Sequence, residues 1–313
     1  MTGLCAYLYS LRVRRSDPVD MLRVAFGKAA RMAGVHRERI DRFDRETMRR
    51  KVERFDRRWV RRDQNGESYY DFRGALLPFD PMYKMYKVFI DSLAIWCHNG
   101  DRYSPRLVRA MDARWEGAYG YTGDGIDVVV RPGDTVIDAG SWIGDFAAYV
   151  SARGATAYAF EPTPGLYDML CRTAKMNAEK NRPGSIVPVR KGLGDRNATV
   201  NFSVCDPKSN GEGNSFLPRE GRDTIAVETT TIDDFVRERG LSRVDFIKAD
   251  IEGYERNMLA GARDTLRRFA PRLALCTYHL PDDPQRLREL ILEANPRYRI
   301  VQLGKKLFAE AEV

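Results

Sequence analysis

The strongest constraint on the fold is a regular alternation of short apolar runs and amphipathic segments that begins at Ile126. Strands that alternate with helices in this way predict a mainly parallel sheet covered by helices on both faces. Because Pro188 cannot donate a ladder hydrogen bond, its strand is expected at a sheet edge. The expected strands are 126–130, 135–138, 156–160, 186–189, 199–205, 244–249 and 273–278, and helices are expected to begin near 143, 163 and 283.

Polar side chains stand at the ends of four of these strands. Asp138, Glu161, Asp250 and His279 each end an apolar run or directly follow one. In such sheets, ligands bind at the carboxyl ends of the strands, near the point where the strand order reverses. A purely structural role would not need polar groups at four strand exits, so the sequence predicts a ligand site at this edge.

The turn DAGSWIGD follows the first of these strands. Its glycines, Gly140 and Gly144, lack the GxGxxG spacing that brings backbone amides to a pyrophosphate, which argues against an NAD-dependent dehydrogenase. Glu161 lies 23 residues beyond Asp138, where a carboxylate accepts hydrogen bonds from both hydroxyls of an adenosine ribose. S-adenosylmethionine fits this pattern because it has an adenosine but no phosphate. Gly140 would let the backbone approach its amino acid tail, and Asp138 would orient the loop.

Four ordered blocks, VIDAGSWIGDF, YAFEPTP, TTTIDDF and VDFIKADIEGYE, resemble the FkbM family of SAM-dependent methyltransferases. The resemblance covers about residues 126–303 and implies the Rossmann-like class I methyltransferase fold. Trp142 stands where many class I enzymes have glycine, although the family tolerates other residues there. The C-terminal segment YRIVQLGKKLFAEAEV looks short for the usual closing antiparallel hairpin. The resemblance implies cofactor contacts at Asp138, Gly140, Gly144, Glu161, Asp195 (near the adenine) and Asp250.

Residues 1–112 are expected to form a mainly helical, basic extension to a methyltransferase domain at 113–313. Residues 1–80 contain 19 Lys and Arg against 12 Asp and Glu, an excess of seven within a net charge of +8. Met48, Val52, Phe55 and Trp59 form an apolar stripe at helical spacing, which is expected to pack on the main domain. We expect the extension to cover the acceptor side of the pocket and to receive an anionic acceptor. A solvated basic face or a partner-docking element is the alternative.

The residues expected to act on the acceptor are His279, Asp250 and Glu252. A hydroxyl acceptor must be aligned with the methyl group and gains from a base, for which His279 is the candidate. Asp250 and Glu252 would orient the acceptor. Each has a structural alternative, because His279 could bond to nearby backbone and carboxylates suit a helix N-terminus. A divalent metal at Asp250 stays open, but no second carboxylate or Asn directly follows His279, so no metal site is predicted.

The acceptor is expected to be a small molecule or a glycan. The exit at Asp250 has neither the Asn/Asp-Pro-Pro-aromatic turn of base methyltransferases nor a cysteine, which argues against nucleic acid. The family resemblance implies O-methylation of a hydroxyl or carboxyl group on a glycan or a secondary-metabolite precursor. An RNA 2′-O-methyltransferase and a SAM-binding module without catalysis stay open. Five scattered cysteines and no apolar run of membrane-spanning length predict a reduced, cytoplasmic protein without a transmembrane segment.

Overall fold

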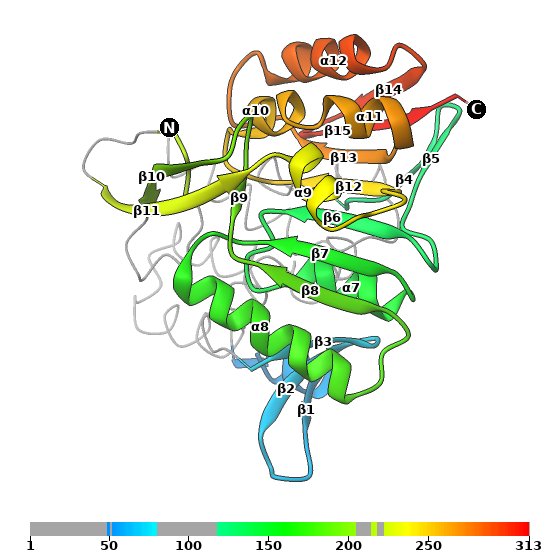
Figure 1. Ribbon diagram of the computed structural model, residues 1–313. Helices are drawn as coiled ribbons and strands as arrows, with labels where there is room; N and C mark the ends of the chain where they lie inside the picture. The colour runs from blue at the N-terminus through cyan, green and yellow to red at the C-terminus, as the bar shows by residue number, and fades with distance from the viewer. Residues whose placement is uncertain (1–48, 51, 80–117, 205–213, 218–221, 313) are drawn as a thin grey trace, which may run out of the picture.

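A seven-stranded sheet forms the centre of the molecule in the computed structural model, which describes residues 49–50, 52–79, 118–204, 214–217 and 222–312. Its strand order is β14-β15-β13-β12-β6-β7-β8, and β15 alone runs antiparallel to both of its neighbours (Figure 1). The strands are β6 (Thr135–Ala139), β7 (Thr156–Phe160), β8 (Ser185–Val189), β12 (Phe246–Ala249), β13 (Arg272–Cys276), β14 (Tyr298–Leu303) and β15 (Lys306–Ala311).

Helices cover both faces of this sheet, as the sequence predicts. Successive strand side chains point to opposite faces, so Val136 and Phe246 enter one hydrophobic core whereas Ile137 and Ile247 enter the other. The first core contains side chains of α7 and α8, and the second contains side chains of α9 to α12. The helices are α7 (Asp145–Ala152), α8 (Pro164–Glu179), α9 (Ile232–Glu238), α10 (Glu255–Ala260), α11 (Arg263–Phe269) and α12 (Asp283–Ala294).

The two edges of the sheet are formed by β8 and by the C-terminal hairpin of β14 and β15, and the sequence analysis made a prediction about each. The strand that contains Pro188, β8, is the edge strand, as predicted. The expectation that the C-terminal segment is short for a closing hairpin is wrong, because β14 and β15 pair from Tyr298↔Ala311 to Leu303↔Lys306. A two-residue turn joins them, with Gly304 at a φ of 58°, and such a turn adds almost nothing to the length that the hairpin requires.

Two of the smaller sheets comprise strands between residues 121 and 230. The expected strand at 126–130 is shorter and belongs to a separate hairpin, and the expected strand at 199–205 pairs with a strand that the sequence analysis did not identify. The hairpin comprises β4 (Tyr121–Gly123) and β5 (Ile126–Val128), and the second sheet comprises β9 (Gly192–Leu193), β10 (Ala198–Val204) and β11 (Asp223–Thr230).

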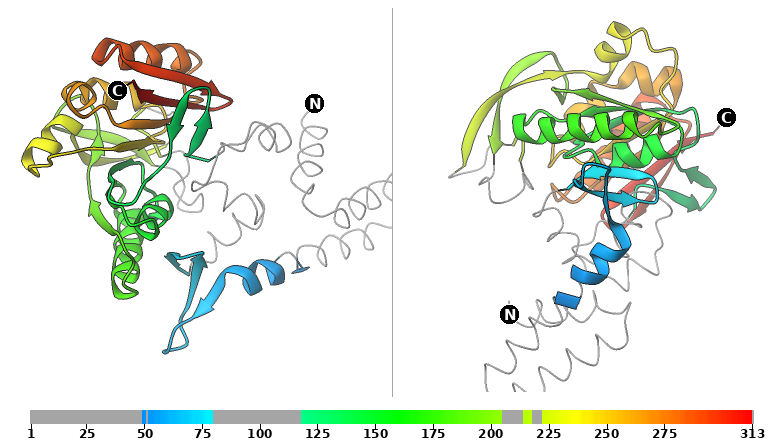
Figure 2. Two further views of the ribbon diagram at one scale, coloured as in Figure 1. Left: turned by 90° about the vertical axis from the view of Figure 1, so that its right-hand side faces the viewer. Right: turned by 90° about the horizontal axis from the view of Figure 1, so that it is seen from below.

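The described part of the N-terminal region is a short helix, residues 52–59, followed by a three-stranded antiparallel sheet. Phe55 and Trp59 are buried as expected, in the same core as α7, whereas Met48 and the proposed boundary at 112 lie outside the described residues. The strands were not predicted, although Tyr70 and Phe72 alternate inward with the period of two that strands require. They are β1 (Val60–Arg62), β2 (Ser68–Phe72) and β3 (Ala75–Pro78), and β3 lies against α7 and α8 (Figure 2).

Asn177 on α8 holds β3 in place. Its buried side chain accepts a hydrogen bond from the Leu76 amide (3.2 Å) and donates to the Leu76 carbonyl (2.7 Å). We expect Asn177→Ala to lower the free energy of unfolding by about 1–3 kcal/mol, because both Leu76 groups lose a partner. Urea unfolding measures this loss, and Lys175→Ala on the exposed side of the same helix should change it by less than about 0.5 kcal/mol. Equal losses in the two variants would contradict this role for Asn177.

Candidate active site

The turn after β6 is shaped by a close approach of two strand ends. The amides of Gly140 and Ser141 both donate to the carbonyl of Phe160, at 3.1 and 2.9 Å. Gly140 has a φ of 73°, and a Cβ at this position would lie 2.1 Å from the carbonyl oxygen of Asp250. The glycine is therefore required by the neighbouring strand end, a reason that the sequence does not reveal. Gly144 ends the turn directly before α7.

Asp138 lies beneath this turn and is fully buried. Its Oδ1 is 3.0 Å from Nζ of Lys248, its register partner on β12. The same ammonium donates to the carbonyls of Ala139 (3.1 Å) and Gly140 (2.6 Å). Burial alone would lower the pKa of Lys248, but the charge of Asp138 raises it above the ordinary value. Asp138 thus supports the turn through Lys248, a charged residue in an apolar strand that the sequence analysis overlooked.

Glu161 stands at the end of β7, beside the turn. Its side chain is almost fully buried and accepts hydrogen bonds from the amides of Trp142 (3.1 Å, at Oε2) and Thr163 (2.9 Å, at Oε1). Burial raises the pKa of Glu161 to about 7, against the opposing effect of the amide and side chain of Thr163 and the amide of Trp142. One amide on each oxygen leaves each oxygen a further lone pair, so the carboxylate can accept two ligand hydroxyls.

Asp250, directly after β12, is the centre of a second group of polar side chains. Its Oδ2 accepts a hydrogen bond from the hydroxyl of Tyr119 at 2.8 Å. Lys306 on β15 is buried, with its Nζ 3.5 Å from the centroid of the Tyr119 ring. Burial alone would raise the pKa of Asp250, but the charges of Lys248, Lys306 and His279 hold it below its ordinary range. Asp250 is therefore ionised, and it depends on Tyr119 and Lys306, which lie outside the motifs used in the sequence analysis.

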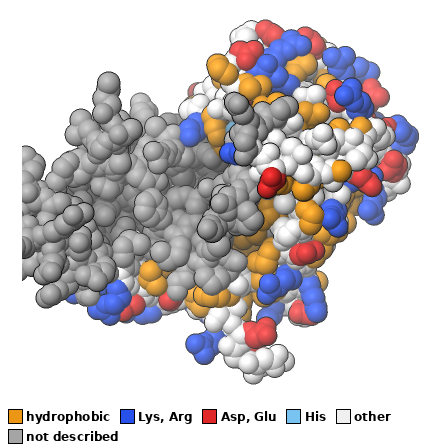
Figure 3. All heavy atoms as spheres, turned by 90° about the vertical axis from the view of Figure 1, so that its left-hand side faces the viewer, with side chains coloured by type: hydrophobic (Ala, Val, Ile, Leu, Met, Phe, Trp, Pro, Cys, Tyr) orange, Lys and Arg blue, Asp and Glu red, His pale blue; other side chains and the backbone are white. Residues whose placement is uncertain are grey.

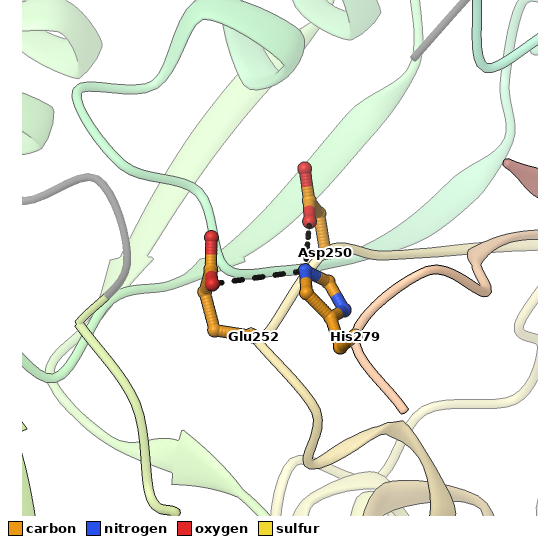
Figure 4. A group of neighbouring side chains, drawn as sticks. All are labelled: Asp250, Glu252 and His279. Carbon is orange, nitrogen blue, oxygen red and sulfur yellow. Dashed lines mark ion pairs between the residues drawn. The ribbon is translucent and has the colours of Figure 1, made fainter. Parts of the chain in front are cut away.

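His279, three residues beyond the end of β13, points toward three carboxylates. Its Nε2 lies 3.6 Å from Oδ1 of Asp250 and 3.8 Å from Oε2 of Glu252 (Figure 4). Its Nδ1 lies 3.1 Å from Oε1 of Glu255. Burial alone would lower the pKa of His279, but Glu255 and the two other carboxylates raise it to about 9. The three carboxylates thus favour a positive charge at this place, and a protonated imidazole cannot act as a base, so that role stays a prediction.

The structural alternative of a carboxylate that binds backbone amides at a helix start describes Glu255. The side chain that accepts backbone amides here is Glu255, which binds the amides of Ile251 (2.9 Å) and Gly253 (3.1 Å). Sequence reasoning missed Glu255, although it follows Glu252 within the block IEGYE. Asp250, Glu252 and His279 are brought together as the sequence predicts.

Asp195 lies just beyond β9, apart from both groups of side chains. It is exposed, and its Oδ2 accepts a hydrogen bond of 3.4 Å from Nδ2 of Asn257 on α10. Its expected place near the adenine stays a prediction.

A parallel sheet with a glycine turn after its first strand and an acidic residue ending the second has the architecture of Rossmann-like methyltransferases. The methyltransferase FkbM domain family matches residues 127–298, more than half of the 313 residues. The chain belongs to this family and is a methyltransferase. Among the described residues, none of the helices has both the length and the apolar character that crossing a membrane requires.

Relatives of the chain include methyltransferases with different acceptors. Hexuronic acid methyltransferase AglP of Haloferax volcanii is 28% identical over 172 residues, which cover 55% of this chain and 67% of the relative. The 31-O-demethyl-FK506 methyltransferase FkbM of Streptomyces tacrolimicus is 27% identical over 218 residues, covering 59% and 80%. The 2-O-methyltransferase NoeI of Sinorhizobium fredii is 25% identical over 159 residues, covering 45% and 62%.

Proposed function

We propose that this chain transfers the methyl group of S-adenosylmethionine to a hydroxyl or carboxyl oxygen of a saccharide or a secondary metabolite. The observation that carries the proposal is that two groups of polar side chains stand at one edge of the sheet. Glu161 and the Gly140 turn suit an adenosine, and Asp250 and His279 suit a polar acceptor. The names of the relatives, which include a hexuronic acid and a 2-O-methyltransferase, support an oxygen acceptor.

The residues around the turn fit this cofactor. Both oxygens of Glu161 keep a lone pair for a ribose hydroxyl, and the buried position keeps water from competing. The turn from Gly140 to Gly144 would receive the amino acid tail, while Asp195 would lie near the adenine and Asp250 near the methyl group. S-adenosylmethionine supplies an electrophilic methyl group on a sulfonium, so the protein has mainly to position the acceptor oxygen.

We further propose an anionic acceptor, received by the basic N-terminal region. The described part of that region is held against α7 and α8, as the hydrogen bonds of Leu76 show. The part of the N-terminal region that we expect to cover the acceptor side of the pocket therefore lies outside the described residues. Figure 3 faces the edge to which the parallel strands point, and basic and acidic side chains are interspersed there among the described residues. Among these described side chains, Figure 3 shows no extended block of basic charge of the kind that suits a polyanion such as RNA.

Radiolabelled S-adenosylmethionine tests the proposal directly. The chain is incubated with it and with separate acceptors: uronic acid saccharides, neutral saccharides, polyketide alcohols and RNA. We expect label in a base-stable ether, or a base-labile ester, of a saccharide or polyketide. Label in RNA alone would establish the 2′-O-methyltransferase alternative. Cofactor binding without transfer to any acceptor would favour a binding module.

Cofactor affinity is expected to depend on pH through Glu161. Its pKa of about 7 means that much of the carboxyl is protonated at pH 6. Ribose hydroxyls donate to the ionised form, so binding at low pH must first remove that proton. We expect the dissociation constant to fall by about 3- to 10-fold between pH 6 and pH 8, as calorimetry measures. Glu161→Gln should lose this part of the profile, and identical profiles in both proteins would exclude Glu161 as the titrating group.

A further inference from the structure

Three ligand atoms of the acceptor-side group converge on one point. Oδ1 of Asp250, Oε2 of Glu252 and Nε2 of His279 face one another (Figure 4), and one such atom from each residue lies within 4.8 Å of the others. Two ligand atoms bound at about 2.1–2.4 Å to one ion, about 90–120° apart, are separated by about 3.0–4.2 Å. The distances of 3.6 and 3.8 Å from Nε2 to the two carboxylate oxygens fall within this span.

His279 is oriented as a metal ligand would be. Its side chain is 4% exposed, and its Nε2, which faces Asp250 and Glu252, has no hydrogen-bond partner. On the other side of the ring, Nδ1 lies 3.1 Å from Glu255, whose carboxylate is fixed by two backbone amides. Metal-binding histidines characteristically have a carboxylate at the second ring nitrogen, which fixes the ring and its tautomer. This contact is independent of the two acidic ligands and points to an ion at Nε2.

We propose that Asp250, Glu252 and His279 bind a divalent cation that holds the acceptor oxygen. Two carboxylates and one imidazole suit Mn²⁺, Mg²⁺ or Zn²⁺. Asp250 offers Oδ1, which accepts a long hydrogen bond of 3.4 Å from the hydroxyl of Tyr278, whereas Oδ2 accepts the shorter bond of 2.8 Å from Tyr119. Glu252 is partly exposed, with 27% of its side chain accessible, so the remaining coordination positions open toward the acceptor side. The sequence analysis predicted no metal site, because it looked for a further ligand directly after His279. In this proposal the third ligand is Glu252, which precedes His279 in the chain.

The role of this ion rests on the proposed function, although its binding does not. A hydroxyl bound to a divalent cation loses its proton more readily, so no protein base is required. The proton leaves to solvent along the open side of the site. A lone pair of the acceptor oxygen forms the new O–CH₃ bond, and the S–CH₃ bond breaks with its electron pair returning to sulfur. The sulfonium becomes a neutral thioether, and charge balances with the released proton.

Manganese binding tests the site without any acceptor. The full chain is freed of metal with EDTA and dialysed, and Mn²⁺ is titrated while free Mn²⁺ is followed by electron paramagnetic resonance. We expect one saturable ion per chain, bound about 10-fold or more weakly by His279→Ala and by Glu252→Gln. Glu228→Gln, the same change at an exposed carboxylate on β11, should bind as the wild type does.

The outcomes separate this inference from the proposed function. Wild-type binding no tighter than that of His279→Ala and Glu252→Gln would overturn the metal site. S-adenosylmethionine binding and methyl transfer that persist in EDTA would overturn its role while leaving the proposed function intact. Specific Mn²⁺ binding by a chain that methylates no oxygen acceptor would support the site and overturn the proposed function.

Discussion

Replacing His279 with alanine is expected to slow methyl transfer by about 10²–10⁴-fold while leaving cofactor affinity within about twofold. A general base contributes about this factor, and a Lewis-acidic ion contributes several kcal/mol, which corresponds to a similar factor. The affinity should persist because His279 follows β13, whereas Glu161 follows β7. Two strands lie between them, and three strand spacings amount to about 14 Å. Single-turnover kinetics with labelled cofactor and calorimetry measure the two quantities.

A second variant keeps this prediction open to test if His279→Ala folds poorly. Glu252→Gln leaves the imidazole in place and changes only a partly exposed side chain, so the fold should tolerate it. If His279 acts alone as a base, this variant should retain most of its rate. If Glu252 is a ligand, its rate should fall as well. A turnover within a few-fold of wild type in both variants would show that His279 is structural.

Much of the main fold was predictable because it depends on local patterns. The apolar runs of the parallel strands and the helix starts at Pro164 and Asp283 were read correctly. The errors arose where a distant partner decides the structure. β2 and β3 form because Tyr70 and Leu77 are buried against the main domain, and nothing near residue 70 reveals that surface. The C-terminal hairpin was misjudged by length, although only a two-residue turn is needed.

The candidate site shows the same division. Asp138, Glu161, Asp250 and His279 were identifiable because each ends or follows a strand, and parallel strands bring their ends to one edge. Lys248 was identifiable in principle, since a lysine within an apolar strand requires a buried partner. Tyr119 and Lys306 were not, because they reach Asp250 from segments far away in sequence. When a side chain on one element influences the ionisation of a residue on another, the sequence around that residue does not reveal it.

The ionised carboxylate of Glu161 is expected to lower the free energy of unfolding and to strengthen cofactor binding. Its pKa is raised from 4.5 in the unfolded chain to about 7 in the fold. The unfolded chain therefore loses its proton first, and the free energy of unfolding falls as pH rises from about 4.5 to about 7. The cost is on the order of a few kcal/mol above pH 7, since each pKa unit corresponds to 1.36 kcal/mol. The fold retains a buried carboxylate that it would be more stable without.

Replacing Glu161 with alanine should accordingly weaken S-adenosylmethionine binding by about 10- to 100-fold or more, because the ribose hydroxyls lose an ionised acceptor worth about 1.5–3 kcal/mol. Glu161→Gln removes the buried charge but keeps an acceptor oxygen for only one of the two backbone amides, so its free energy of unfolding should fall less between pH 5 and pH 8 than that of the wild type. Calorimetry gives the affinity, and urea unfolding at pH 5 and pH 8 gives the stability. Unchanged affinity in a folded variant, or tight NAD binding by the wild type, would overturn the cofactor assignment. Weaker binding without loss of stability would identify a carboxylate that is retained for its ligand, in the way that functional sites commonly trade stability for activity.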